Sequence, residues 1–214
     1  MKRTVFTIMF FCCAMVMAAQ NTVTVKFQGA KPTISDFVWA LINEHDKQAA
    51  EEEEGCADES FGGLENAWKQ HHKGQKLGEG KTLTIDTKNG YVCFEYKSEY
   101  QQTVNVVRVD LCYWNEADQK HKLLAYNVQC YENGNPSHGQ FDGLIFYRYN
   151  NATKKMTFVE SPGFEVQYGT GDGGDVAYEL PRSGKNIIKT TYWPKTHKIL
   201  KQTLVWNGSK FTQQ

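Results

Sequence analysis

The sequence has no excess of charge of either sign, because 24 Lys and Arg residues balance 24 Asp and Glu residues. It also lacks a run of Lys and Arg that would form a local basic patch. Without either feature, nothing in the composition attracts the chain to nucleic acid or to anionic lipid. We therefore expect no nucleic-acid partner.

The motifs of common metal sites and active sites are also missing. There is no Cys-x-x-Cys pair, no His-Glu-x-x-His pattern and no Gly-x-Ser-x-Gly turn, and the six histidines are not spaced as metal ligands. Residues 78–82 resemble the end of a phosphate-binding loop, but Gln75 stands where the first glycine is required. The sequence thus predicts no catalytic residue, no metal ligand and no cofactor, and it favours a binding protein over an enzyme.

Glycine and aspartate gather in residues 169–175. Asp172 and Asp175 could offer the oxygen ligands that calcium prefers, but the spacing of an EF-hand loop is absent. A flexible connecting loop is the simpler interpretation, and the sequence leaves the role of this segment open.

One long apolar run is present, at the N-terminus. Lys2 and Arg3 precede an unbroken stretch of apolar or small residues over 5–18, and polar residues begin at Gln20. This three-part pattern predicts a secretory signal peptide over residues 1–19, cleaved after Ala19 or, alternatively, after Ala18. The run is short for a bilayer span, so we expect a mature chain without a transmembrane segment, secreted or located in the periplasm or at the cell surface.

Four cysteines remain after this cleavage, an even number that is compatible with two disulfides in an exported protein. Strand alternation places Cys93 and Cys112 on the same face of two strands that we expect to be neighbours. Cys130 lies on an apolar face, where a helix could bring Cys56. The sequence therefore favours the pairs Cys93–Cys112 and Cys56–Cys130, with reduced, buried cysteines as the alternative.

Residues 32–75 carry the signals of helices. Thr33 and Asp36 resemble a capping box, and apolar residues then recur at spacings of three and four on one helix face: Ile34, Phe37, Val38, Leu41 and Ile42. We predict an amphipathic helix that begins at residue 34, continues into the acidic run at 51–54 and ends at Gly55. A shorter helix is predicted over 64–71.

From residue 81 to residue 212 the hydrophobic pattern changes to period two, which is typical of half-buried strands. The sequence predicts strands around 83–85, 92–96, 107–113, 124–130, 143–149, 154–160, 186–192, 198–206 and 209–212, and a short one at 22–27. Helices followed by strands indicate one α+β domain over residues 20–214, with the helices packed on a long, curved antiparallel meander. The alternative is an up-and-down barrel with an external helix.

Aromatic side chains gather near the ends of the predicted hairpins. If their rings are exposed, they could stack on sugars or contact a partner; if they are buried, they belong to the core. The candidate binding residues are Trp114, Tyr149, Tyr192, Trp193 and Trp206. Their ligand would be a glycan, a peptide or an envelope protein.

Two C-terminal stretches, Tyr178–Ile187 and Leu204–Phe211, resemble the endings of small secreted proteins of unknown function from Bacteroidetes, and the N-terminal segment is similar to theirs. The resemblance covers about the last sixth of the chain and implies a periplasmic or surface location. It implies no activity and no catalytic residues.

Together these patterns predict an exported, non-catalytic binding or interaction module. The alternative is a small hydrolase whose site lies in the concavity of the sheet. The two differ in one structural respect: a hydrolase needs polar groups with perturbed pKa values that converge in a cleft.

Overall fold

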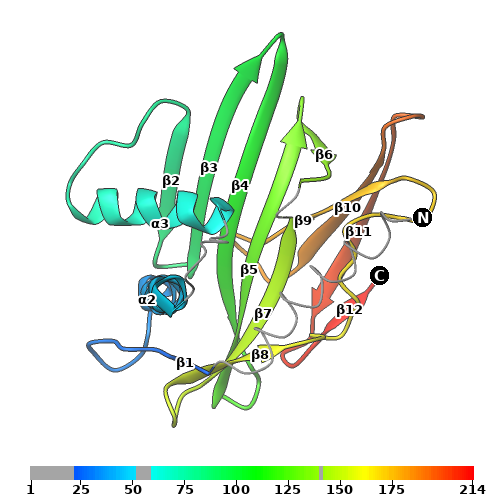
Figure 1. Cartoon of the computed structure of the whole chain (residues 1–214). Coiled ribbons are helices and arrows are strands. Elements are labelled where there is room, and N and C mark those ends of the chain that lie inside the picture. The colour runs from blue at the N-terminus through cyan, green and yellow to red at the C-terminus, as the bar shows by residue number, and fades with distance from the viewer. Residues whose placement is uncertain (1–21, 52–58, 140–141) are drawn as a thin grey trace.

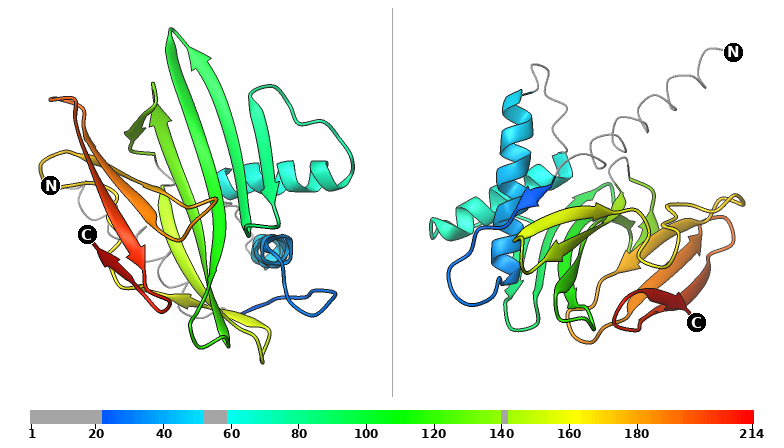
Figure 2. Two further views of the ribbon diagram at one scale, coloured as in Figure 1. Left: turned by 180° about the vertical axis from the view of Figure 1, so that it is seen from behind. Right: turned by 90° about the horizontal axis from the view of Figure 1, so that it is seen from below.

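The computed structural model describes residues 22–51, 59–139 and 142–214. The segment interpreted as a signal peptide, the acidic run at 52–54, the helix stop at Gly55 and Cys56 lie outside these ranges. The described chain forms three layers: two helices, a large sheet and a small sheet (Figure 1, and the right view of Figure 2).

The helices are α2 (Ile34–Glu51) and α3 (Glu59–His72). The Asp36 carboxylate accepts hydrogen bonds from both the backbone N–H and the hydroxyl of Thr33, at 2.7 and 2.8 Å, so the Asp36 half of the predicted capping box forms. All five apolar residues predicted on one face of α2 are buried against the large sheet. In the described part of the chain, no helix is both long enough and apolar enough to cross a bilayer.

The large sheet is antiparallel and curled like a half-barrel. Its strands follow the order β1-β8-β7-β5-β4-β3-β2, and β6 pairs with the end of β5. The strands are β1 (Val23–Thr24), β2 (Lys81–Asp86), β3 (Tyr91–Tyr100), β4 (Thr103–Asn115), β5 (His121–Glu132), β6 (Asn135–Ser137), β7 (Gly143–Asn150) and β8 (Lys155–Val159). Because β1 and β2 stay at opposite ends of this order, the sheet is not the closed barrel that we considered as the alternative.

The small sheet contains the last four strands, in the order β12-β11-β10-β9. These are β9 (Asp175–Glu179), β10 (Ile187–Trp193), β11 (Lys198–Trp206) and β12 (Phe211–Gln213). The sequence predicted most of these strands but placed all of them in a single meander. In the structure the chain leaves the large sheet after β8 and returns across its other face (Figure 1).

The middle of the large sheet is therefore covered on both faces, and β5 shows this most clearly. Leu124, Tyr126 and Val128 point to the helices, whereas Leu123 and Ala125 point to the small sheet. Residues 122–129 are buried without interruption. The α+β class and the helix-on-meander packing are confirmed, and a second core lies between the two sheets.

Two amides of β5 hold the small sheet in place. The side-chain N–H of Asn127 donates to the Tyr178 carbonyl at 2.9 Å, and the side-chain oxygen of Gln129 accepts from the Tyr178 N–H at 2.8 Å. Both amides are at most 1% exposed. β9 is the edge strand of the small sheet, so these side chains satisfy backbone groups that would otherwise be buried and unpaired.

The predicted Cys93–Cys112 disulfide is wrong. The two cysteines lie on the same face of adjacent strands, as expected, but the register places Cys93 opposite Asp110 and Cys112 opposite Tyr91. They are thus diagonal neighbours, whose Cα atoms are typically about 7–8 Å apart, beyond the reach of a disulfide. Among the described cysteines, Cys93, Cys112 and Cys130 form no disulfide with one another.

We expect Asn127→Ala to lower the free energy of unfolding by about 1–3 kcal/mol, because it leaves the buried Tyr178 carbonyl without its donor. Urea denaturation measures this change. Asn105→Ala, on the exposed side of β4, is the matched control and should change the stability by less than about 0.5 kcal/mol. Equal effects of the two variants would contradict the role of Asn127.

We expect the protein, denatured and alkylated without any reductant, to carry the label on both Cys93 and Cys112. In the native state both thiols should react slowly, because burial raises the pKa of each and so removes the reactive thiolate. Peptide mapping by mass spectrometry measures both results. A cross-linked Cys93–Cys112 peptide would overturn this prediction, and the same map tests whether Cys56 pairs with Cys130.

Candidate functional site

A cleft opens where the small sheet stops covering the large one. Its volume is about 590 Å³. The floor is formed by β2, β3 and β4, and the wall by the segment that joins β9 to β10. The residues that line it are Thr84, Tyr91, Cys93, Glu95, Arg108, Glu179, Leu180, Pro181, Arg182, Ser183, Gly184, Lys185, Asn186 and Ile188.

The register of β3 and β4 brings the polar residues of the floor together. Glu95 pairs with Arg108, and Cys93 pairs with Asp110. These residues point away from the helices. Their neighbours along the two strands, Val92, Phe94, Val109 and Leu111, point the other way and pack against the helices. The period-two pattern therefore places a row of polar side chains on the face that the small sheet only partly covers.

Three of these side chains form one hydrogen-bonded group. Arg108 Nε lies 3.0 Å from both carboxylate oxygens of Asp110, and Arg108 Nη2 donates to the Tyr91 hydroxyl at 2.8 Å. The same hydroxyl donates to Asp110 at 2.6 Å. The Asp110 side chain is 1% exposed and that of Arg108 is 25% exposed. The Nε side of the guanidinium is therefore bonded to the buried Asp110 carboxylate, and the rest of the side chain lines the cleft.

The protonation behaviour of this group opposes acid–base or nucleophilic chemistry at neutral pH. Burial, and then the charge of Asp110, raise the pKa of both Tyr91 and Cys93, so the phenol and the thiol keep their protons. Burial, the largest single effect, would lower the pKa of Arg108, but the interactions with Asp110, Cys93 and Tyr91 together raise it. A fixed cation beside a protonated thiol and phenol is suited to binding a ligand.

The wall of the cleft is held by bonds from several elements. Trp114 Nε1 donates to the Lys185 carbonyl at 2.8 Å, and Arg182 Nε lies 3.0 Å from the Asp86 carboxylate. Hydrogen bonds from Asn89, and then from Arg182, lower the pKa of Asp86. Residues 179–187 of this wall belong to the stretch on which the resemblance to secreted proteins was based.

Three of the five aromatic residues predicted to bind a ligand lie in the core. Trp114 and Trp206 are at most 7% exposed and pack around Phe211 between the sheets, and Tyr149 is fully buried beneath α2. Their rings cannot stack on a ligand without unfolding of the core. Strand alternation alone did not reveal this, because it does not show which face a second sheet covers.

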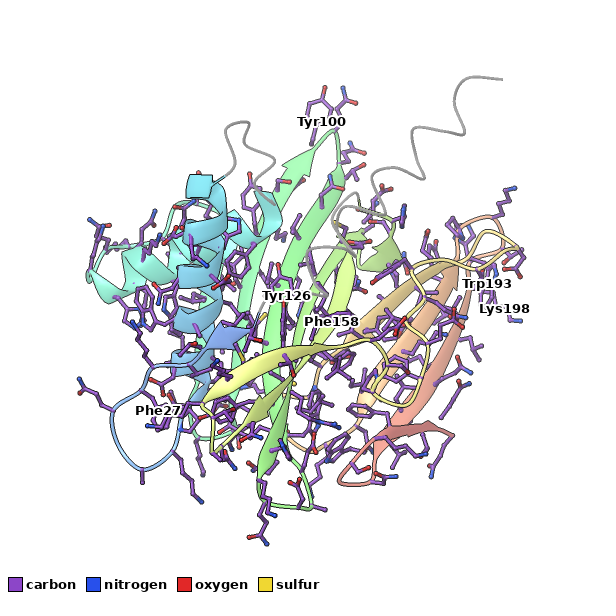
Figure 3. All side chains as sticks on the ribbon, turned by 60° about the horizontal axis from the view of Figure 1, so that its bottom comes forward. Phe27, Tyr100, Tyr126, Phe158, Trp193 and Lys198 are labelled. Atoms are coloured by element: carbon purple, nitrogen blue, oxygen red, sulfur yellow. The ribbon has the colours of Figure 1, made fainter. Side chains whose placement is uncertain are left out.

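Tyr192 and Trp193 are partly exposed at the end of β10 and do not line the cleft. Figure 3 labels Trp193 beside Lys198 of the next strand. The Tyr192 hydroxyl lies 3.0 Å from His197 Nδ1, and the Lys198 ammonium lies 5.2 Å from the ring centroid of Trp193. The structure thus divides the five aromatic residues between the core and a hairpin tip and brings none of them into the cleft.

The Gly/Asp segment at 169–175 is a closed turn beside Trp193. The Thr170 hydroxyl donates to the Asp172 carboxylate at 2.5 Å and accepts from the Gly174 N–H at 2.7 Å. The bond from Thr170 is the main reason that the pKa of Asp172 is lowered. A Cβ at Gly174 would lie 2.9 Å from the Trp193 indole nitrogen, so the close packing requires glycine there. The Asp172 carboxylate is therefore engaged within the turn.

Among the described residues, two other clusters contain enough carboxylate and imidazole groups to suggest a metal. In the first, His45, Asp46 and Glu65 surround Lys69, whose ammonium lies 2.6 Å from Glu65 and 3.0 Å from Asp46. In the second, Glu116 pairs with Arg148 and Asp118 pairs with His121. The carboxylates of both clusters already have a partner from the chain itself.

We found no family model, curated protein or solved structure that significantly matches the chain. The function must therefore be argued from the cleft itself. Arg108, which lines the floor, and Asp110, which is buried behind it, were not singled out from the sequence, and an Arg-x-Asp pair in a strand carries no signal of its own.

We expect Arg108→Ala to lower the free energy of unfolding by about 3–5 kcal/mol, because it leaves the Asp110 carboxylate buried without its counter-ion. Urea denaturation measures this loss. Arg182→Ala removes an ion pair at the rim and should have a much smaller effect. The double variant Arg108→Ala, Asp110→Asn should recover part of the loss; no recovery would contradict an electrostatic origin.

Proposed function

We propose that the protein is an exported, non-catalytic binding module whose cleft holds a short peptide segment with a Lys or Arg side chain. The observation that carries this proposal is the set of charges around the cleft. Within the described chain, Asp110 neutralises Arg108 and Asp86 neutralises Arg182, whereas Glu179 and Lys185 have no ion pair.

The charges that remain favour a cationic group on the ligand. Glu95 lies 3.8 Å from Arg108 Nη1 and its side chain is 42% exposed, so its carboxylate remains accessible. With Glu179, it gives the cleft two acidic groups against one free cation, Lys185. A Lys or Arg side chain on the ligand would restore the balance.

A peptide fits the lining better than a sugar. Sugar sites commonly present an aromatic face, but among the described residues of the lining the one aromatic ring is Tyr91, which is 3% exposed. The lining instead offers carboxylates, two guanidinium groups, an ammonium group, hydroxyls and an amide, together with Leu180, Pro181 and Ile188. Such a mixture matches the alternating donors, acceptors and side chains of a peptide.

Export is supported by the sequence pattern of residues 1–19 and by the resemblance of residues 178–187 to secreted proteins. A non-catalytic role is supported by the raised pKa values of Tyr91 and Cys93, which keep the phenol and the thiol at the floor of the cleft protonated near neutral pH.

The test is a titration with two blocked tripeptides, acetyl-Ala-Lys-Ala-amide and acetyl-Ala-Glu-Ala-amide, followed by NMR of the isotope-labelled secreted protein. We expect the Lys peptide to bind more tightly and to shift amide resonances of β3, β4 and residues 180–186. Glu179→Gln should weaken its binding roughly fivefold, which corresponds to about 1 kcal/mol.

Glu132→Gln is the matched control, because Glu132 is also an exposed carboxylate at a strand end but does not line the cleft. Equal affinity for the two peptides, or equal effects of the two Glu→Gln variants, would overturn the proposal. A chitotriose titration tests the glycan alternative. Cleavage of either peptide, detected by mass spectrometry, would favour the hydrolase.

A further inference from the structure

A second pocket lies on the same face of the large sheet, near its β1–β8 end and beyond the small sheet. Its volume is about 310 Å³. It is formed by the start of β5, the end of β7, the start of β8 and the residue before β1. Among the described residues its lining contains no carboxylate: it has two cations, an imidazole, an amide and three hydroxyls.

The strand register explains why these groups meet. Arg148 lies opposite Thr157, and Asn150 lies opposite both Lys155 and His121. The residues between them, Tyr149 and Met156, are fully buried on the helix side. Alternation therefore places Arg148, Asn150, Lys155 and Thr157 together on the opposite face.

The Arg148 guanidinium is oriented by a hydrogen bond to Glu116, which does not line the pocket. Its Nε donates to Glu116 at 2.7 Å, and Glu116 is 8% exposed. Within the described chain, the two Nη groups make no hydrogen bond, and the side chain is 45% exposed. An arginine fixed through Nε presents its remaining N–H groups as a planar fork, the geometry that suits an oxyanion.

Asn150 is also fixed, and its bonds define what it presents. Its side-chain oxygen accepts the backbone N–H groups of Ala152 and Thr153, at 2.9 and 3.1 Å. The amide nitrogen must therefore face His121 Nε2, 3.1 Å away, so Nε2 accepts and the imidazole proton is on Nδ1. That proton is donated to Asp118 at 2.5 Å. The second N–H of the Asn150 amide is left as a donor at the pocket.

We propose that this pocket binds a phosphate or sulfate group. Arg148 supplies two-point hydrogen bonding, Lys155 supplies a charge that no acidic residue of the described chain pairs, and Asn150, Thr22 and Thr157 supply neutral donors. Glu116 and Asp118 lie outside the lining and are turned toward Arg148 Nε and His121 Nδ1. The site is separate from the peptide cleft and does not depend on it.

The test is an NMR titration of the secreted protein with inorganic phosphate and with sulfate at constant ionic strength, with chloride as the reference anion. We expect saturable shifts of the amide resonances of Asn150, Lys155 and Thr157 with both oxyanions. Lys155→Gln should weaken this binding roughly tenfold, and Thr157→Val should weaken it by a smaller factor.

Lys154→Gln is the matched control, because it makes the same charge change at the adjacent residue. The Lys154 ammonium lies outside the pocket, 5.1 Å from the centroid of the Phe27 ring (Figure 3 labels Phe27). Titrations with glucose 6-phosphate and glucose 6-sulfate distinguish an esterified ligand from a free ion. If the natural ligand is an ester, the esters should bind more tightly than inorganic phosphate and sulfate; if it is the free ion, they should not. Shifts that chloride reproduces, or equal weakening by Lys154→Gln and Lys155→Gln, would overturn the proposal.

Discussion

The contact between β5 and the backbone of Tyr178 is the constraint on which the arrangement of the two sheets depends. Asn127 donates to the C=O of Tyr178 and Gln129 accepts from its N–H, so both backbone groups of this buried edge-strand residue are satisfied. An edge strand without such partners would leave buried polar groups unpaired, each at a cost of about 1–3 kcal/mol. These bonds fix β9 across β5, so the segment that follows β9 must pass over β3 and β4. The wall of the cleft is therefore a consequence of two buried amides.

The Arg108–Asp110 pair gives the cleft its chemistry and adds a cost to the fold. A carboxylate that is 1% exposed is tolerated because a guanidinium and a phenol are both bonded to it. The same bonds hold the Arg108 side chain at one position in the floor, where a ligand would meet a preorganised group. Burial beside that charge also raises the pKa of both Tyr91 and Cys93, so the phenol and the thiol stay protonated.

The difference in size between the two sheets explains why candidate sites occur at both borders of their contact. The small sheet has four strands and packs over the middle of the large one, through the apolar residues around Phe211. On either side, the outward-facing residues of the large sheet remain accessible: Glu95 and Arg108 toward β2, and Arg148 and Lys155 toward β1. Polar residues on that face would be ordinary solvent contacts in an isolated meander, but beside the small sheet they line concave surfaces.

Hydrophobic spacing and capping in the sequence determined the amphipathic helix that begins at Ile34, and the alternation of apolar residues determined most strands, because both are local properties of the chain. Alternation also placed Cys93 and Cys112 on one face correctly. It could not decide their relative register, which excludes the disulfide, nor the split into two sheets, which buries Trp114 and Trp206. Nor did it identify Arg108 and Asp110 as a site. A row of polar residues on a strand indicates a solvent-facing row, unless another part of the chain is known to cover that face. That covering comes from residues about 70 positions later in the chain, such as Lys185 against Trp114. Contacts over such separations leave no periodic trace in the sequence, so only the tertiary structure decided where the cleft lies.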